Sequence, residues 1–160
     1  MRFSSIAIIF QSASIFVTTL AGGKIAHIPE SRKSFQCERR LILGSSYERT
    51  LFEVLGQIRF KEILPIDKSI IYNLVDQADD STNVFYEDET PDAFFFHKLE
   101  KPVDAIKDGV YVYDTNHILV IDNHGRTCGI VMRTVVRHRS INRSDVPDSG
   151  ASFMLCTITS

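Results

Sequence analysis

An arginine-rich stretch near the C-terminus offers the plainest candidate chemistry in this chain. Between Arg126 and Arg143 the sequence holds five arginines and no acidic residue. If one strand runs through this stretch, Arg133, Arg137 and Arg139 project to one side of it. A row of cations binds the phosphates of RNA without any proton transfer, and exposed tyrosines can stack on its bases. The candidate RNA-binding residues are therefore these three arginines together with Tyr86, Tyr111 and Tyr113.

The same arginines admit a plainer interpretation, in which they form a solvated surface that balances an acidic neighbour. Charge runs are usually of this kind, and the stretches DQADD (76–80) and YEDETPD (86–92) supply acids. Overall charge does not favour nucleic acid either. Without Arg2, which lies in the expected leader, 17 basic residues face 20 acidic ones, a net charge of −3.

How the three cysteines are interpreted depends on the N-terminal 21 residues, because these decide whether the chain enters an oxidising compartment. This segment has one early positive charge, an apolar run broken by polar residues, and small residues before position 22, which together predict a cleaved signal peptide and secretion. An uncleaved anchor is the alternative, and no later segment could span a bilayer. The sequon Asn142–Ser144 suits a secreted loop.

In an oxidising compartment, a cysteine near each end of the mature domain suggests a bridge between Cys37 and Cys156. Such a bridge closes a loop of about 120 residues and stabilises the fold by roughly 4–5 kcal/mol in the chain-entropy model. Cys128 lies in an apolar strand, so we expect a small buried side chain. No cysteine or histidine cluster has metal-ligand spacing, and we expect no metal and no cofactor.

The elements that must position these residues form an α+β domain. Residues 22–34 are expected to form a flexible mature N-terminus. Residues 35–160 are expected to form the folded domain. Apolar spacing predicts a helix at about 46–59, capped by Ser45. The stretch 61–83 is ambiguous between a short helix and a loop, and Phe94–Phe96 are expected in the core. Later residues predict antiparallel strands, including a hairpin that turns at Gly125.

The order of these features resembles the small secreted fungal ribonucleases that prefer guanine. The resemblance is carried by FQC before the first strand, by EKPV, by HILVIDNHGRTCGIVMRT and by FMLCT, which ends the last strand. The leader, the aromatic-x-Cys near the mature start and the terminal cysteine resemble a narrower group, the RNase-like effectors of powdery mildew fungi. The likeness spans roughly 35–158 and implies one N-terminal helix packed on a central antiparallel sheet, a microbial ribonuclease-like fold.

In that family a glutamate base, a histidine acid, an arginine and a second histidine cleave RNA. The resemblance places Glu100 at the base, His117 near the phosphate-binding arginine, Asp88 nearest the second histidine and Arg133 at the general acid. Arginine keeps its proton far above neutral pH and is no useful donor. Because losing a general acid costs roughly 10²–10⁴-fold in rate, we expect a pseudo-ribonuclease with no catalytic residues, in which Glu100, His117 and Arg133 are vestigial. We also expect Arg133 to face a concave groove, with Val131 and Val135 on the same face.

Three functions follow from these expectations. The first is a secreted virulence effector with an inactive ribonuclease-like fold, delivered into the host plant cell, where it binds host RNA or host protein. The second is an active endoribonuclease that uses Glu100 with altered partners. The third is an effector that binds protein alone, possible partners including a plant immune receptor. None of them involves a membrane.

Overall fold

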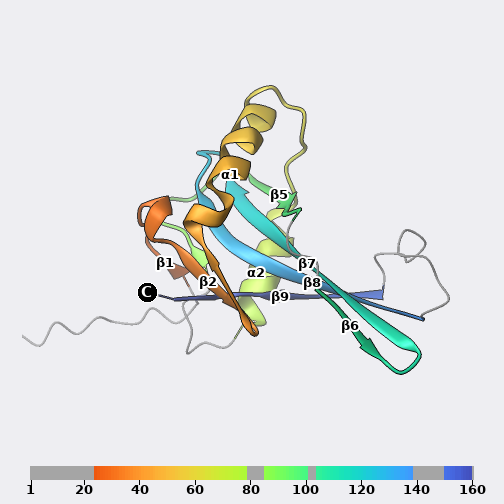
Figure 1. Cartoon of the computed structure of the whole chain (residues 1–160). Helices are drawn as coiled ribbons and strands as arrows, with labels where there is room; N and C mark the ends of the chain where they lie inside the picture. Colours follow the sequence, from red (N-terminus) through yellow and green to blue (C-terminus); the bar gives the residue numbers. More distant parts are fainter. Residues whose placement is uncertain (1–23, 79–84, 101–103, 139–149, 160) are drawn as a thin grey trace, which may run out of the picture.

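The computed structural model describes residues 24–78, 85–100, 104–138 and 150–159 (Figure 1). The expected leader at 1–21 lies outside this part, as do Arg139 and Asn142. The helices are the 3₁₀ turn η1 (Glu30–Arg32), α1 (Gly44–Arg59) and α2 (Lys68–Asp76). The strands are β1 (Lys24–Ile25), β2 (Ser34–Cys37), β3 (Arg40–Leu43), β4 (Phe85–Tyr86), β5 (Phe94–Lys98), β6 (Asp104–Asp108), β7 (Tyr111–Asp122), β8 (Thr127–His138), β9 (Ala151–Leu155) and β10 (Thr157–Ile158).

The central sheet is antiparallel and is built on the hairpin of β7 and β8. Its strand order is β5-β7-β8-β9, with β6 also pairing with β7. The far ends of β7 and β8, together with β6, extend from the body as an arm (Figure 1). The predicted hairpin is confirmed: Gly125 has a φ of 82°, and the Asp122 carboxylate accepts hydrogen bonds from the N–H groups of His124 and Arg126.

The two helices contribute to cores on opposite faces of this sheet. On what we call the α1 face, Leu119, Ile121, Ile130 and Met132 belong to one buried cluster with Leu51 and Val54 of α1. On the α2 face, Ile118, Val120, Val131 and Leu155 belong to a second cluster with Ile71 and Leu74 of α2. The alternation of strand side chains produces this division. Phe94 and Phe95 are buried, as predicted, one on each face.

The expectation of a single N-terminal helix is wrong, because the described residues hold two α-helices on a mostly antiparallel sheet. The second, α2, lies in the ambiguous stretch, and its N-cap Asp67 accepts a hydrogen bond from Ser69 N–H. The helix expected at about 46–59 runs from Gly44 to Arg59 and has no side-chain cap, so Ser45 does not fill that role. It begins earlier because Gly44 N–H donates a hydrogen bond to Lys33 O. Position 44 requires glycine, since a Cβ added there would collide with Glu30 O.

Residues 24–34, expected to form a flexible N-terminus, contain β1, η1 and the start of β2. β1 pairs in parallel with β4, and Lys33 is 1% exposed. A small sheet follows, in the order β10-β2-β3. Next to it the predicted disulfide joins Cys37 to Cys156, with Cα atoms 4.6 Å apart, so the two ends of the domain are linked. Within the described residues, no helix has the length and apolar character needed to cross a membrane.

Candidate functional site

The β7–β8 register places two of the positions that the resemblance assigned to catalysis on opposite faces of the sheet. Arg133 pairs with Asn116, while His117 pairs with Met132. His117 is 1% exposed and shares the α1 face with Met132. Arg133 is half-buried on the α2 face, with Val131 and Val135 as expected. Both valines are buried, so Arg133 shares its face with packed apolar side chains.

Of the other two positions, Glu100 lies beside β7 and Asp88 lies at the hairpin turn. Glu100 is exposed and follows Leu99, whose N–H donates to His117 O. Glu100 is close enough to His97 to affect its titration: burial lowers the pKa of His97, and the charges of Glu53 and Glu100 oppose this shift. Asp88 forms an ion pair with Arg126, at 2.8 Å, beside the hairpin turn. Arg126 precedes Arg133 by seven residues, which is roughly 23 Å along a strand. Asp88 and His117 therefore do not share one acid–base site with Arg133.

The residues predicted to bind RNA do not share a surface either. Arg133 and Arg137 both lie on the α2 face. Half-buried Tyr113 pairs with Val136 and lies on the α1 face. Arg137 Nε donates to Asp114 Oδ2 at 2.6 Å, with the two side chains 18% and 4% exposed, so a buried carboxylate balances this cation. Tyr86 is 1% exposed, in ring contact with His27 and Phe35, and cannot stack on a base, which corrects that prediction.

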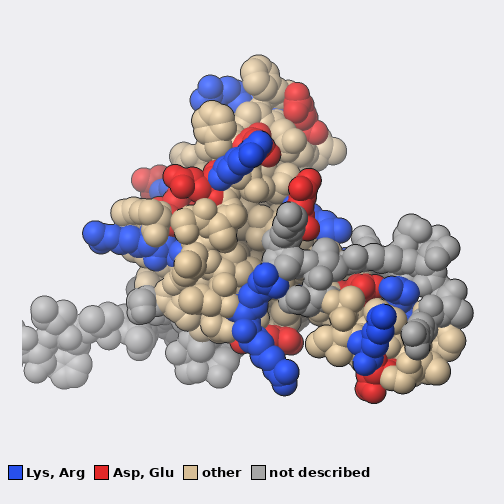
Figure 2. All heavy atoms as spheres, in the orientation of Figure 1, with Lys and Arg blue, Asp and Glu red and all other residues tan. Residues whose placement is uncertain are grey.

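Two further observations concern this set. Tyr111 is 50% exposed, and its ring meets the His138 ring edge-on. On the face of the molecule in Figure 2, basic and acidic side chains are interspersed, and no large area of one sign appears among the described residues. This agrees with the interpretation of the arginines as balanced surface charges.

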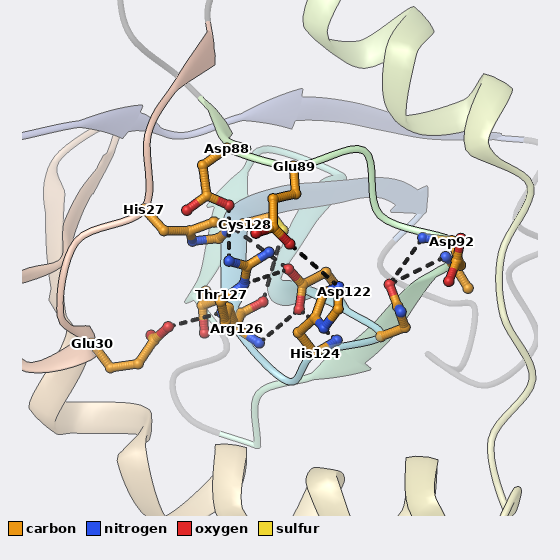
Figure 3. A network of polar contacts seen from close by, with 12 residues as sticks. His27, Glu30, Asp88, Glu89, Asp92, Asp122, His124, Arg126, Thr127 and Cys128 are labelled. Atoms are coloured by element: carbon orange, nitrogen blue, oxygen red, sulfur yellow. Dashed lines mark hydrogen bonds and ion pairs between the residues drawn. The ribbon is translucent and has the colours of Figure 1, made fainter.

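A polar cluster that the sequence did not predict lies where β1 and η1 meet the β7–β8 turn (Figure 3). At its centre the buried Lys33 ammonium has three acceptors: Glu30 Oε1 at 2.6 Å, Thr127 O at 2.7 Å and His27 Nδ1 at 3.0 Å. Burial, with the charges of Lys33 and Arg126, lowers the pKa of His27 to about 4. His27 is therefore neutral, with its proton on Nε2.

His27, Asp122 and Cys128 have donor atoms within 4.8 Å of one another, a spacing that a metal ion could bridge. Their other contacts fit a cation poorly. Lys33 donates to His27 Nδ1, so Nε2 carries a proton toward Asp122 Oδ2 at 3.6 Å. Arg126 Nε already donates to that same carboxylate oxygen at 2.8 Å. Burial raises the pKa of the Cys128 thiol, which stays protonated and unreactive. The cluster suits a hydrogen-bond network that ties the N-terminal segment to the hairpin.

A groove of about 730 Å³ follows the outer edge of β9, and we call it the β9 groove. Its lining comes from β9 itself, from the neighbouring part of β7 and β8, from the end of α2 and from Glu38 and Thr157. Phe153 and Met154 are exposed there by 40% and 47%. No sequence pattern identified this groove, because its walls come from elements far apart in the chain.

Comparison with known proteins adds no relative: no family model, no curated protein and no solved structure matches this chain.

Proposed function

We propose that this chain is a secreted effector with a ribonuclease-like scaffold that acts by binding a host protein and not by cleaving RNA. The observation that carries the proposal is the β7–β8 register, which sets Arg133 and His117 on opposite faces of the central sheet. The resemblance to powdery mildew effectors supplies the context, in which the leader directs secretion and the target lies in a plant cell.

The chemistry of RNA cleavage supports the non-catalytic half of the proposal. A base and an acid must act on the two sides of one phosphate, within hydrogen-bond reach of the protons they transfer. Arg133 cannot supply a proton at neutral pH, and His117 is buried among apolar neighbours. Asp88 pairs with Arg126 at the hairpin turn. Exposed Glu100 is thus left without a matched acid.

The distribution of charge supports a protein partner over RNA. Phosphate binding requires cations that can be freed from their own counter-ions. Arg137 instead donates to a buried carboxylate, and Tyr113 lies on the other face from the arginines. The β9 groove has one charged lining residue, Glu38, which repels phosphate.

Two assays on the mature chain test this proposal. With a guanyl-preferring fungal ribonuclease as positive control, we expect no cleavage of single-stranded RNA above the background of a Glu100→Gln variant. We also expect no RNA binding that weakens steeply between two salt concentrations. Cleavage that Glu100→Gln abolishes would establish the active endoribonuclease. Salt-sensitive binding reduced by Arg133→Met would establish an RNA-binding protein.

A further inference from the structure

One edge of strand β9 is without a partner strand in the described part of the chain. β9 pairs with β8 and is the last strand in its sheet. Cys156 N–H donates to Ile130 O, so by alternation Met154 and Ser152 also bond toward β8. The N–H and C=O groups of Ala151, Phe153 and Leu155 therefore point outward.

Natural proteins usually protect such an edge with lysine, proline, a bulge or an inward charge. The sequence of β9, ASFML, contains no charge and no proline. Its register with β8 is regular over all five of its residues. Unpaired backbone groups in this arrangement are a template for one more strand.

The β9 groove gives this edge the shape of a strand-binding site. Leu74, Gln77 and Ala78 of the α2 end form one wall, while Phe153 and Met154 provide apolar surface on the two faces of the strand. The edge is recessed between α2 and the segment that holds Glu38. A single extended peptide can lie along this space, and we take it, rather than a second copy of the chain, as the occupant.

Glu38 sets the charge of the groove at one end. It has a φ of 50°, uncommon for a residue other than glycine, and it follows the disulfide cysteine Cys37 in the turn between β2 and β3. The pairing of Thr157 with Gln36 places Glu38 beside the Leu155 end of β9. A basic residue of a bound peptide would complement it there.

We propose that the β9 groove binds an extended peptide segment of a partner protein as an added strand. The peptide pairs with the backbone of Ala151, Phe153 and Leu155, places apolar side chains at alternate positions, and sets a lysine or arginine beside Glu38. This inference rests on the proposed function in one respect, since it names the chemistry through which a protein partner is held.

The test uses the mature, disulfide-bonded chain and a displayed library of random ten-residue peptides. The selected peptides should show apolar alternation with a basic residue at one end. Phe153→Ala and Phe153→Pro form a matched pair, because both remove the ring and only proline removes the outward N–H without breaking a bond to β8. We expect the selected peptides to bind Phe153→Pro on the order of tenfold more weakly than Phe153→Ala.

Glu38→Gln should reduce the preference for the basic residue and leave the apolar alternation in place. If Phe153→Pro does not fold, as judged by its thermal midpoint, Ala151→Pro makes the same test at the next outward N–H. Equal binding by the alanine and proline variants, or a library that yields no peptide, overturns the inference. A dimer of the free chain that Phe153→Pro abolishes also overturns it, in favour of a second copy.

The RNA assays separate this failure from that of the proposed function. A chain that cleaves RNA and still selects peptides refutes the proposed function alone. One that neither cleaves RNA nor selects peptides refutes the groove alone.

Discussion

Replacing Lys33 with methionine should destabilise the fold severely, although the residue lies in a segment that the sequence suggested was flexible. Its side chain is 1% exposed and its ammonium is 2.6 Å from Glu30 Oε1. Methionine keeps a similar length but leaves Thr127 O and His27 Nδ1 without their donor, and leaves Glu30 Oε1 with only the Thr127 N–H. Removing one partner of a buried pair costs roughly 3–5 kcal/mol. Because Glu30 Oε1 keeps the Thr127 N–H as a donor at 3.0 Å, we expect the lower end of this range, about 3 kcal/mol.

The measurement is urea unfolding with the disulfide intact. With a slope of about 2 kcal/mol per molar urea, the midpoint should fall by roughly 1.5 M. Arg49→Met is the matched control: Arg49 also forms an ion pair, at 3.1 Å from Glu53 Oε1, but the two side chains are 92% and 59% exposed. An exposed pair contributes about 0–1 kcal/mol, so this control should barely shift the midpoint.

A second readout distinguishes the cluster from general loss of packing. The positive charge of Lys33 is one cause, after burial, of the low pKa of His27. Lys33→Met should therefore raise the pKa of His27 from about 4, as followed by the ring signals in an NMR titration. If Lys33→Met is no more destabilising than Arg49→Met, or leaves the His27 titration unchanged, our account of this cluster is wrong.

Three other predictions concern stability. His27 has a folded pKa of about 4 against an ordinary 6.5, so the unfolded chain binds the proton more readily. The contribution of neutral His27 to the free energy of unfolding should be fully present above pH 6.5. The free energy of unfolding should then fall by about 3 kcal/mol as the pH drops to 4, and the fall should be shallower in His27→Gln. Replacing Cys37 and Cys156 with serine should cost about 4–5 kcal/mol, visible as a lower thermal midpoint, while Cys128→Ala should cost less. Gly125→Ala should destabilise by about 1–3 kcal/mol, because φ is 82° and the new Cβ would lie 1.9 Å from a leucine of α1. Gly56→Ala, which meets nothing within 4 Å, should instead stabilise by up to about 1 kcal/mol; equal effects would contradict both assignments.

Features set by neighbouring residues were predicted best. The β7–β8 hairpin follows from apolar strands on either side of a turn with glycine at positive φ, and α1 follows from its apolar spacing. The disulfide follows from cysteines near both ends of a domain that we expect to be secreted. The stretch that holds α2 is ambiguous by sequence because its nine residues are too few for a clear period, and packing on the sheet is what makes it a helix.

The sequence could not show which face each strand residue occupies. Alternation places Arg133 with Val131 and Val135, but it does not relate β8 to β7. That relation depends on a register shift between Val120 and Ile121, and a slip of one residue exchanges the two faces of a strand. The expected grouping of arginines and tyrosines failed for this reason.

By itself, the amino-acid sequence determined the composition of the fold: its α+β class, its main hairpin and the pair of cysteines that joins its ends. These depend on local backbone preference, apolar period and cysteine position, all of which can be recognised within a short stretch or from simple order. Only the tertiary structure decided that Lys33 meets Thr127, 94 positions away, that His117 and Arg133 are separated by the sheet, and that an uncharged edge strand borders a groove. Such contacts follow from strand register and from packing between distant segments, and no local pattern in a single chain contains either.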